Sequence, residues 1–303
     1  MHKFKIYSAI SIAMLIWSFS FIWTRQAILS FQPITLVTLR LLLASVLLFL
    51  VSKMAGKFQL LRREDVKWFL LLAFFEPFMY YIGETYGLTM VESTLASVII
   101  STIPLFAPVL AYFLLKEKIS FANIAGILVS LSGVFMVIYE PKDGFTVNPW
   151  GIVLMFLAVF SAICYTTTLR KISTHYSTIN VIFYQSLVGL FFFIPTFFMV
   201  DYSTFSTSII TSEGLFALFM LAVFASVIAF VLFAGVVRKI GVARTNVFVN
   251  LIPVFTAVLA WWLLDEQLNG LKFSGIAITV IGLFVSQMGK FKLKIKQIKG
   301  TEY

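Results

Sequence analysis

The sequence predicts an all-α polytopic membrane protein whose ten transmembrane helices form an inverted repeat of five and five. Hydrophobic residues make up 60% of the 303 residues and charged residues only 12%, whereas a soluble domain carries about a quarter charged residues. The apolar residues come in runs of roughly 17 to 24, the length that crosses a bilayer as a helix. Residues 98–135 also recur 149 positions later, as residues 247–284. A duplicated membrane unit indicates two halves around one central site, as in a transporter.

The spans follow from the apolar runs in chain order, and the linkers between them leave no room for a separate soluble domain. The first run follows Lys3 and Lys5 but ends without a small-residue cleavage site, so we interpret it as a retained helix and not as a signal peptide. The ten expected helices cover residues 6–24, 34–52, 66–88, 95–115, 121–139, 149–168, 177–199, 214–237, 243–264 and 271–288.

The repeat divides the chain into residues 1–140, residues 145–288 and a basic tail at residues 289–303. Each half contains five helices, an odd number, so the second half must be inverted relative to the first. The glycines in the last helix of each half recur at a spacing of seven, which favours close helix packing. Without a gap, the alignment pairs Pro104 with Pro253, Glu117 with Glu266, Gly126 with Gly275 and Gly133 with Gly282.

Lysine and arginine decide the orientation, because they are enriched in cytoplasmic loops. With the N-terminus inside, nineteen of these residues fall on the inner side and three on the outer side, while Arg40 lies within a span. Both termini are therefore expected in the cytoplasm of a cell with this protein in its inner membrane. The hairpin at residues 116–118 is expected inside and its copy, Asp265 to Gln267, outside. The lysine-rich tail is a positive-inside signal or, alternatively, a site for anionic lipid.

Composition also excludes several kinds of site. The single cysteine, Cys164, excludes an internal disulfide and a multi-cysteine metal site, and two histidines leave no histidine-rich metal cluster. We expect no metal and no cofactor. The net charge of +10 follows the membrane topology, so it does not indicate nucleic acid. The expected partners are a small-molecule substrate and the lipid bilayer, and a monomer is the expected state.

Three features together resemble the drug/metabolite transporter superfamily, in particular its ten-helix EamA-type permeases, over residues 8–287. The first span contains the aromatic-rich run at residues 17–21, and the second contains Leu39, Arg40 and Leu41, similar to the family's Leu-Arg-Phe stretch. The fourth and ninth spans each combine a proline with a Leu-Leu-x-Glu hairpin, where Lys116 or Asp265 replaces the family's glycine. The resemblance implies an inverted repeat and a central cavity lined by helices 1, 3, 4, 6, 8 and 9. It implies transport of small metabolites but no particular substrate.

Glu76 is the most informative ionisable residue within a span, because such residues are costly and usually functional. Counted from Lys67, it lies about 14 Å deep, near the midplane. Desolvation there favours the neutral form of a carboxyl group, which is then able to exchange a proton. We predict that Glu76 couples protons or balances a cationic substrate group; the alternative is a structural partner for Arg40. Pro77 should open the helix beside it. Glu84, two turns further, is expected at the solvated outer mouth.

Two other polar positions in the spans favour structural roles. Arg40 aligns with Gln185 in the repeat, which predicts an inter-helix contact in each half. Binding of an anionic substrate group is the alternative for Arg40.

The repeat also indicates a polar face in the fourth and ninth spans. Ser97 and Ser101 precede Pro104 by seven and three residues, as Asn246 and Asn250 precede Pro253. Residues four apart share a helix face. We assign the asparagines to a substrate cavity, with helix packing as the alternative, and include both serines as substrate-binding candidates although packing is favoured for them.

Aromatic residues complete the expected site. Trp17, Tyr80, Tyr81 and Tyr165 are candidates to stack on a substrate, with Trp17, Tyr80 and Tyr165 retained as site residues. The hydroxyls at residues 166–168 should bond back to their own helix.

The leading hypothesis is a secondary transporter that exports a small metabolite, such as an amino acid, by alternating access. The sequence contains no phosphate-binding loop, so ATP is not the direct driver. A lipid or lipid-linked carrier of the same superfamily is the first alternative. A membrane-embedded enzyme is the second, but only Glu76 is available at mid-depth for acid–base chemistry, so we expect no enzyme.

Overall fold

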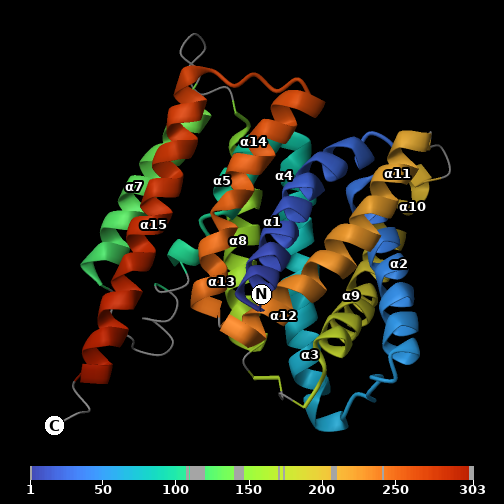
Figure 1. Cartoon of the computed structure of the whole chain (residues 1–303). Helices are drawn as coiled ribbons and strands as arrows, with labels where there is room; N and C mark the ends of the chain where they lie inside the picture. The colour runs from blue at the N-terminus through green and yellow to red at the C-terminus, as the bar shows by residue number, and fades with distance from the viewer. Residues whose placement is uncertain are drawn as a thin grey trace.

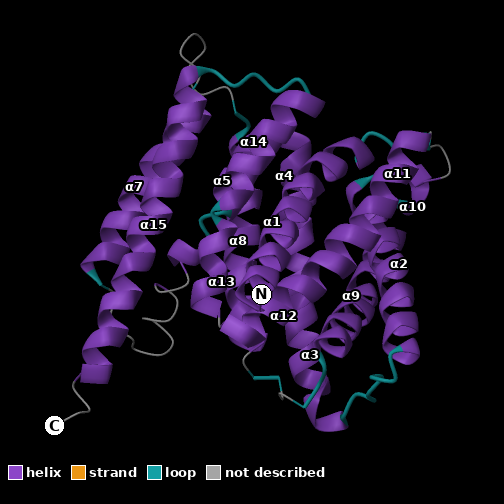
Figure 2. Ribbon diagram, viewed as in Figure 1, coloured by secondary structure: helices purple, strands orange, loops and turns teal. Residues whose placement is uncertain are grey.

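The computed structural model describes residues 2–106, 109, 120–139, 147–169, 171–172, 175–205, 210–240 and 242–299. All secondary structure in these ranges is helical, and short loops join the helices (Figure 2). The helices are α1 (His2–Ala27), α2 (Pro33–Met54), α3 (Val66–Ala73), α4 (Tyr80–Met90), α5 (Ser93–Ile100), α7 (Phe121–Ile138), α8 (Pro149–Leu169), α9 (Thr178–Val200), α10 (Tyr202–Phe205), α11 (Ser212–Met220), α12 (Phe230–Ile240), α13 (Val242–Val249), α14 (Leu251–Leu263) and α15 (Gly270–Lys299). A 3-10 turn, η1 (Arg63–Asp65), precedes α3, and π-helical segments η2 (Phe74–Met79) and η3 (Leu221–Ala229) join α3 to α4 and α11 to α12.

Seven helical stretches of the described chain are long and apolar enough to cross a membrane, and shorter apolar helices lie at residues 93–106, 247–263 and 270–286. Each of the ten expected spans overlaps one of these, which confirms the polytopic helical fold, although most of residues 107–115 of the fourth span lie outside the described residues. The surface agrees with a lipid surrounding, since large apolar side chains such as Leu128, Phe191 and Phe198 are exposed. Trp150, Trp261 and Trp262, near the ends of spans, are exposed as well.

Local sequence explains where several helices begin. Pro33 occupies the first turn of α2, where its missing N–H costs no helical hydrogen bond. Ser120 and Asn123 cap each other's backbone N–H at the start of α7, and Ser177 accepts a hydrogen bond from the backbone N–H of Asn180 at the start of α9.

Three spans are interrupted at polar residues. Glu76 has non-helical dihedral angles (φ −142°, ψ 113°) within η2, and Pro77 follows it. The expected local opening of this helix is therefore confirmed. Ser101 ends α5 and Asn250 precedes α14, each three residues before a proline. The fourth and ninth spans are thus broken at positions that the sequence repeat pairs.

The helices α7 and α15 lie side by side at one edge of the bundle (Figure 1). A Cβ atom on Gly133 would lie 2.5 Å from the Gly275 carbonyl oxygen, and one on Gly126 would lie 2.6 Å from the Gly282 carbonyl oxygen. The prediction that these four glycines mark close packing is confirmed. Because Gly126 faces Gly282 and Gly133 faces Gly275, the two helices run antiparallel.

Candidate functional site

The interruption in η2 places Glu76 inside the bundle. Its side chain is 8% exposed. Pro77 has no backbone N–H, and the hydroxyl of Ser161 in α8 donates to the carbonyl oxygen of Phe75, 2.5 Å away. On the other side Gly189 of α9 allows close approach, since a Cβ there would lie 2.4 Å from Cγ of Pro77. Two neighbouring helices therefore fix the broken segment that carries this carboxyl group.

Arg40 of α2 lies in the same region and is 4% exposed. Its Nε donates to the hydroxyl of Ser226 in η3 at 2.7 Å, and its Cζ lies 4.4 Å from the ring centroid of Tyr81. It forms no ion pair with Glu76 or Glu84, since none of its nitrogen atoms lies within 4.0 Å of their carboxylate oxygens. Its charge still interacts with both carboxyl groups. Glu76 and Arg40 therefore do not form a direct ion pair.

Glu84 corrects an expectation from the sequence. The sequence predicts a solvated position at the outer mouth, but the side chain is only 6% exposed and accepts a hydrogen bond from the hydroxyl of Tyr80 at 3.2 Å. Neighbouring helices, among them α8 and α2, pack against α4, which the apolar pattern of a single helix does not reveal. Glu76 and Glu84 are therefore both buried, and Tyr80 lies with them.

Trp17 and Tyr165 contact neighbouring helices. The indole Nε1 of Trp17 donates to the carbonyl oxygen of Ala225 at 3.3 Å, and its ring packs against Phe230 and Phe233. Tyr165 donates to Oε1 of Gln185 at 3.0 Å. Arg40 and Gln185 therefore both make inter-helix contacts, but with unlike partners. The hydroxyls of residues 166–168 bond back to carbonyl oxygens of α8, which confirms that prediction.

Three of the candidates on the fourth and ninth spans, Ser97, Ser101 and Asn250, are buried. Ser97 and Ser101 have no exposed surface and donate to the carbonyl oxygens of Thr94 and Val98, at 2.8 and 2.7 Å. Asn250 is 1% exposed. The side chain of Asn246 lies outside the described part of the chain. Asn250 precedes α14, which packs against α1 and α5, whereas Glu76, Tyr80 and Tyr165 lie on η2, α4 and α8, which pack against one another.

The sequence does not predict the hydrogen bonds and the ion pair that link helices at the upper end of the bundle in Figure 1. Glu266 accepts hydrogen bonds from the backbone N–H groups of Ser93 and Thr94, at 2.7 and 3.1 Å, so it caps α5. Lys272 pairs with Glu92 at 2.9 Å. A signal existed, because an acidic residue in a short hairpin is suited to a helix N-terminus, but its partner is 173 residues away.

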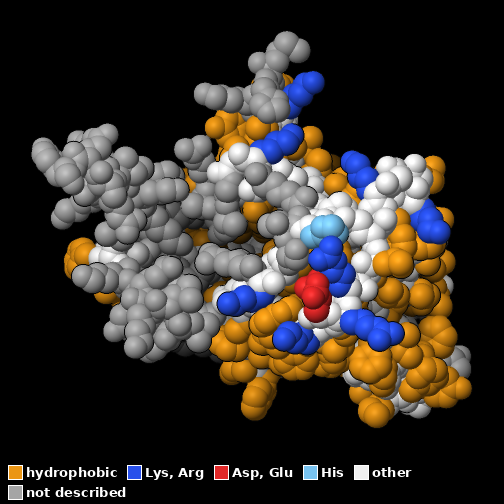
Figure 3. All heavy atoms as spheres, turned by 90° about the horizontal axis from the view of Figure 1, so that it is seen from below, with side chains coloured by type: hydrophobic (Ala, Val, Ile, Leu, Met, Phe, Trp, Pro, Cys, Tyr) orange, Lys and Arg blue, Asp and Glu red, His pale blue; other side chains and the backbone are white. Residues whose placement is uncertain are grey.

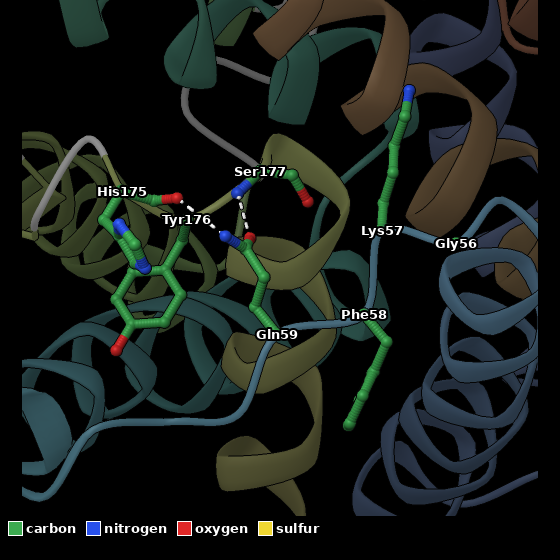
Figure 4. A pocket seen from close by; sticks show the side chains of 7 residues that line it. All are labelled: Gly56, Lys57, Phe58, Gln59, His175, Tyr176 and Ser177. Carbon is green, nitrogen blue, oxygen red and sulfur yellow. Dashed lines mark hydrogen bonds between the residues drawn. The ribbon is translucent and has the colours of Figure 1, made fainter.

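A second set of hydrogen bonds links segments at the lower end of the bundle. The amide of Gln59 donates to the His175 carbonyl oxygen at 2.9 Å and accepts from the Ser177 backbone N–H at 2.7 Å (Figure 4). Beside them lies a pocket of about 320 Å³ lined by residues 56–59 and 175–177. Burial raises the pKa of Tyr176, whose hydroxyl donates to Asp65 at 2.8 Å. These contacts join the loop after α2 to the start of α9.

Comparison with known proteins places the chain. A model of the EamA-like transporter family matches residues 4–139 and 149–288. An uncharacterized transporter of Bacillus subtilis, YetK, is 30% identical over 83% of this chain and 77% of its own length. A probable amino-acid metabolite efflux pump of Escherichia coli is 23% identical over 92% of this chain and 93% of its own. A solved crystal structure that is 18% identical matches with a TM-score of 0.68 over 95% of this chain and 99% of its own, which shows the shared fold.

Proposed function

Because the chain belongs to the EamA-like transporter family, we propose that this multi-pass membrane transporter exports a small amino-acid-like metabolite by alternating access. Transport, and not catalysis, is what the family and its named relatives indicate. Two relatives, from Escherichia coli and Salmonella typhimurium, are named probable amino-acid metabolite efflux pumps. The observation that carries the proposal is the buried group of Arg40, Glu76 and Glu84, which places both signs of charge within the bundle.

Glu76 has the central role in this proposal. Its carboxyl group accepts no hydrogen bond from the described residues, although it lies almost fully inside the bundle. It binds the ammonium group of the substrate in one step and a proton in another, so the two ligands compete for one carboxylate. Such competition couples outward movement of substrate to inward movement of protons. Tyr80 and Tyr165 flank this group, and Trp17 contributes an apolar wall.

The test uses purified protein in liposomes with a radiolabelled panel of the proteinogenic amino acids. With the interior acidic relative to the exterior, uptake of at least one amino acid should exceed that of protein-free liposomes, because protons leave as substrate enters. The uptake should stop when a protonophore collapses the gradient. If no amino acid moves in either direction, the proposed function is wrong.

The inverted repeat has two supports in the structure. The antiparallel contact of α7 with α15 is reciprocal, since the pair Gly126 and Gly282 corresponds through the repeat to the pair Gly275 and Gly133. The breaks at Ser101 and Asn250 also correspond. A transporter with such halves alternates access when one repeat rocks against the other.

Both termini are proposed to lie in the cytoplasm. The lower end of the molecule carries clustered lysine and arginine side chains (Figure 3), among them the exposed residues Lys53, Lys57, Arg62 and Lys67 of the segment from α2 to α3. Single cysteines introduced at the exposed residues Gln267 and Lys57, with Cys164 replaced by serine, test the orientation in intact cells. An impermeant maleimide should label position 267 and not position 57. Labelling of position 267 only after the cytoplasmic side is opened would contradict the proposed inversion.

A further inference from the structure

Only some of the hydrogen-bond donors of Arg40 have partners among the surrounding residues. A guanidinium group has five N–H donors in one plane. The Nε–H donates to Ser226, and one face of the plane covers the ring of Tyr81. The Nη1 and Nη2 groups donate no hydrogen bond to, and form no ion pair with, any residue that the structure describes. Four donors of a side chain that is 96% buried are thus left over.

Unpaired charge inside a membrane protein is costly, so it usually has a function. Two carboxyl groups are available nearby, yet neither Glu76 nor Glu84 closes an ion pair with Arg40. Neither Nη atom of Arg40 is among the fully enclosed atoms without partners, and neither are the carboxylate oxygens of Glu76. These atoms therefore reach a space that admits at least water.

We propose that Arg40 binds the carboxylate of the transported substrate through Nη1 and Nη2. This inference rests on the proposed function and makes it narrower: the substrate must be a carboxylic acid as well as an amine. The outer edge of a guanidinium matches the two oxygens of a carboxylate and forms two parallel hydrogen bonds. Ser226 and Tyr81 fix the plane in advance, so little side-chain freedom is lost on binding. Glu76 then binds the ammonium group, so the two charged groups of the substrate pair with the two side chains that form no ion pair with each other.

The test compares each amino acid with its amide, which has nearly the same shape and lacks the anionic carboxylate. The probes are leucine, phenylalanine, lysine and threonine, each with its amide, and the measurement is competition for transport by the wild-type protein in liposomes. For a transported amino acid, the amide should compete at least about tenfold more weakly, as expected when charge-assisted hydrogen bonds are lost. The ratio of interest is the concentration of amide that halves transport divided by the concentration of acid that does so. Arg40→Gln should bring this ratio close to one, and Arg40→Lys should give an intermediate ratio.

Arg25→Gln is the matched control, because Arg25 lies at the end of α1 and donates to the carbonyl oxygen of Leu88, outside the site. It should leave the ratio unchanged. If the amide competes as well as the acid in the wild-type protein, Arg40 does not bind a carboxylate, even where Arg40→Gln fails to fold. If the wild-type protein prefers the acid over the amide and a folded Arg40→Gln protein keeps the same preference, the carboxylate binds elsewhere. If no acid and no amide is transported, the proposed function fails, and this inference fails with it.

Discussion

The seam between α7 and α15 and the group around Glu76 are both buried within the membrane bundle, yet they differ in how their polar atoms are used. In the seam, backbones approach each other at glycines, and Asn123 donates to the carbonyl oxygen of Ser286 at 2.9 Å. Around Glu76, the carboxyl group of Glu76 and the Nη groups of Arg40 make no hydrogen bond to the described residues, although Arg40 Nε donates to Ser226 and Glu84 accepts from Tyr80. Burial is similar in the two regions, but only the second leaves strong hydrogen-bonding groups open to a ligand.

The comparison shows that burial by itself does not identify a functional site in a membrane protein. Small residues let helices approach and gain dispersion contacts, which stabilises the bundle. An unpaired carboxyl or guanidinium group does the opposite, because its desolvation is not offset. Substitutions in the seam should therefore change stability, and substitutions at the charged group should change transport.

The largest effect is expected from Gly133→Ala in the seam. The added Cβ would lie 2.5 Å from both the carbonyl oxygen of Gly275 and the backbone nitrogen of Thr279, and backbone atoms cannot move aside as a side chain does. We expect a loss of unfolding free energy of about 1–3 kcal/mol, as is usual for overpacking. Thermal unfolding in detergent, followed by size-exclusion chromatography, measures it.

Gly235→Ala in α12 is the matched control, because nothing lies within 4 Å of its added Cβ. Alanine favours a helix over glycine by up to about 1 kcal/mol, so this variant should be as stable as the wild type or more so. Equal destabilisation by both substitutions would mean that the seam is not closely packed.

The next largest effect is expected at the charged group. Glu76→Gln should reduce proton-driven transport at least about tenfold and remove its dependence on pH, because an amide cannot exchange a proton. Stability should not fall, since glutamine has nearly the same shape as glutamate and the Glu76 carboxyl group makes no hydrogen bond to the described residues that the substitution would remove. Transport in liposomes over a range of pH values measures the first effect, and thermal unfolding the second.

Glu84→Gln is the matched comparison and should have a smaller effect. The glutamine side chain keeps an oxygen that can accept the hydrogen bond from Tyr80. A wild-type pH profile in the Glu76 variant, or a larger loss in the Glu84 variant, would assign the coupling role to another residue.

The sequence predicted the parts of the fold that depend on local pattern. Apolar run length placed the ten spans as far as the structure describes them, and the spacing of Gly126 and Gly133 identified a packing face. Pro77 predicted the break beside Glu76, because a missing N–H has a local consequence. In each case the determining residues lie within one span.

The candidate site was less predictable because its geometry depends on which spans meet. The depth of Glu84 along its helix suggested solvent, but packing of other helices encloses it. Arg40 and Ser226 are 186 residues apart, and no periodic pattern links them. The cap that Glu266 provides for α5 likewise joins residues that lie far apart in the sequence. Such contacts follow from the assembled bundle and not from any one helix.

A moderate effect is expected from Asn250→Ala. The asparagine lies at the break before α14 and is 1% exposed. We propose that its amide helps to orient the substrate, so its removal should weaken substrate competition about three- to tenfold, the usual range for one neutral hydrogen bond. Ser101→Ala should matter less, because the Ser101 hydroxyl donates to Val98 of its own helix. Normal substrate affinity in a folded Asn250→Ala protein would remove Asn250 from the site.

The smallest effect is expected from Thr279→Val in the seam. The hydroxyl of Thr279 donates to Gly275 in its own helix at 2.9 Å and reaches the carbonyl oxygen of Ser130 in α7 at 3.4 Å. Valine keeps the shape of the side chain, so only the hydrogen bonding changes. The expected loss of stability is about 0.6 kcal/mol, the average for hydrogen bonds between membrane helices. Thr196→Val in α9 is the control, because among the described residues its hydroxyl bonds to Phe192 of its own helix alone. Transport and the preference for acids over amides should not change in either variant, since both lie outside the charged group. A transport defect in a stable Thr279→Val protein would mean that the seam moves during transport and is not a static contact.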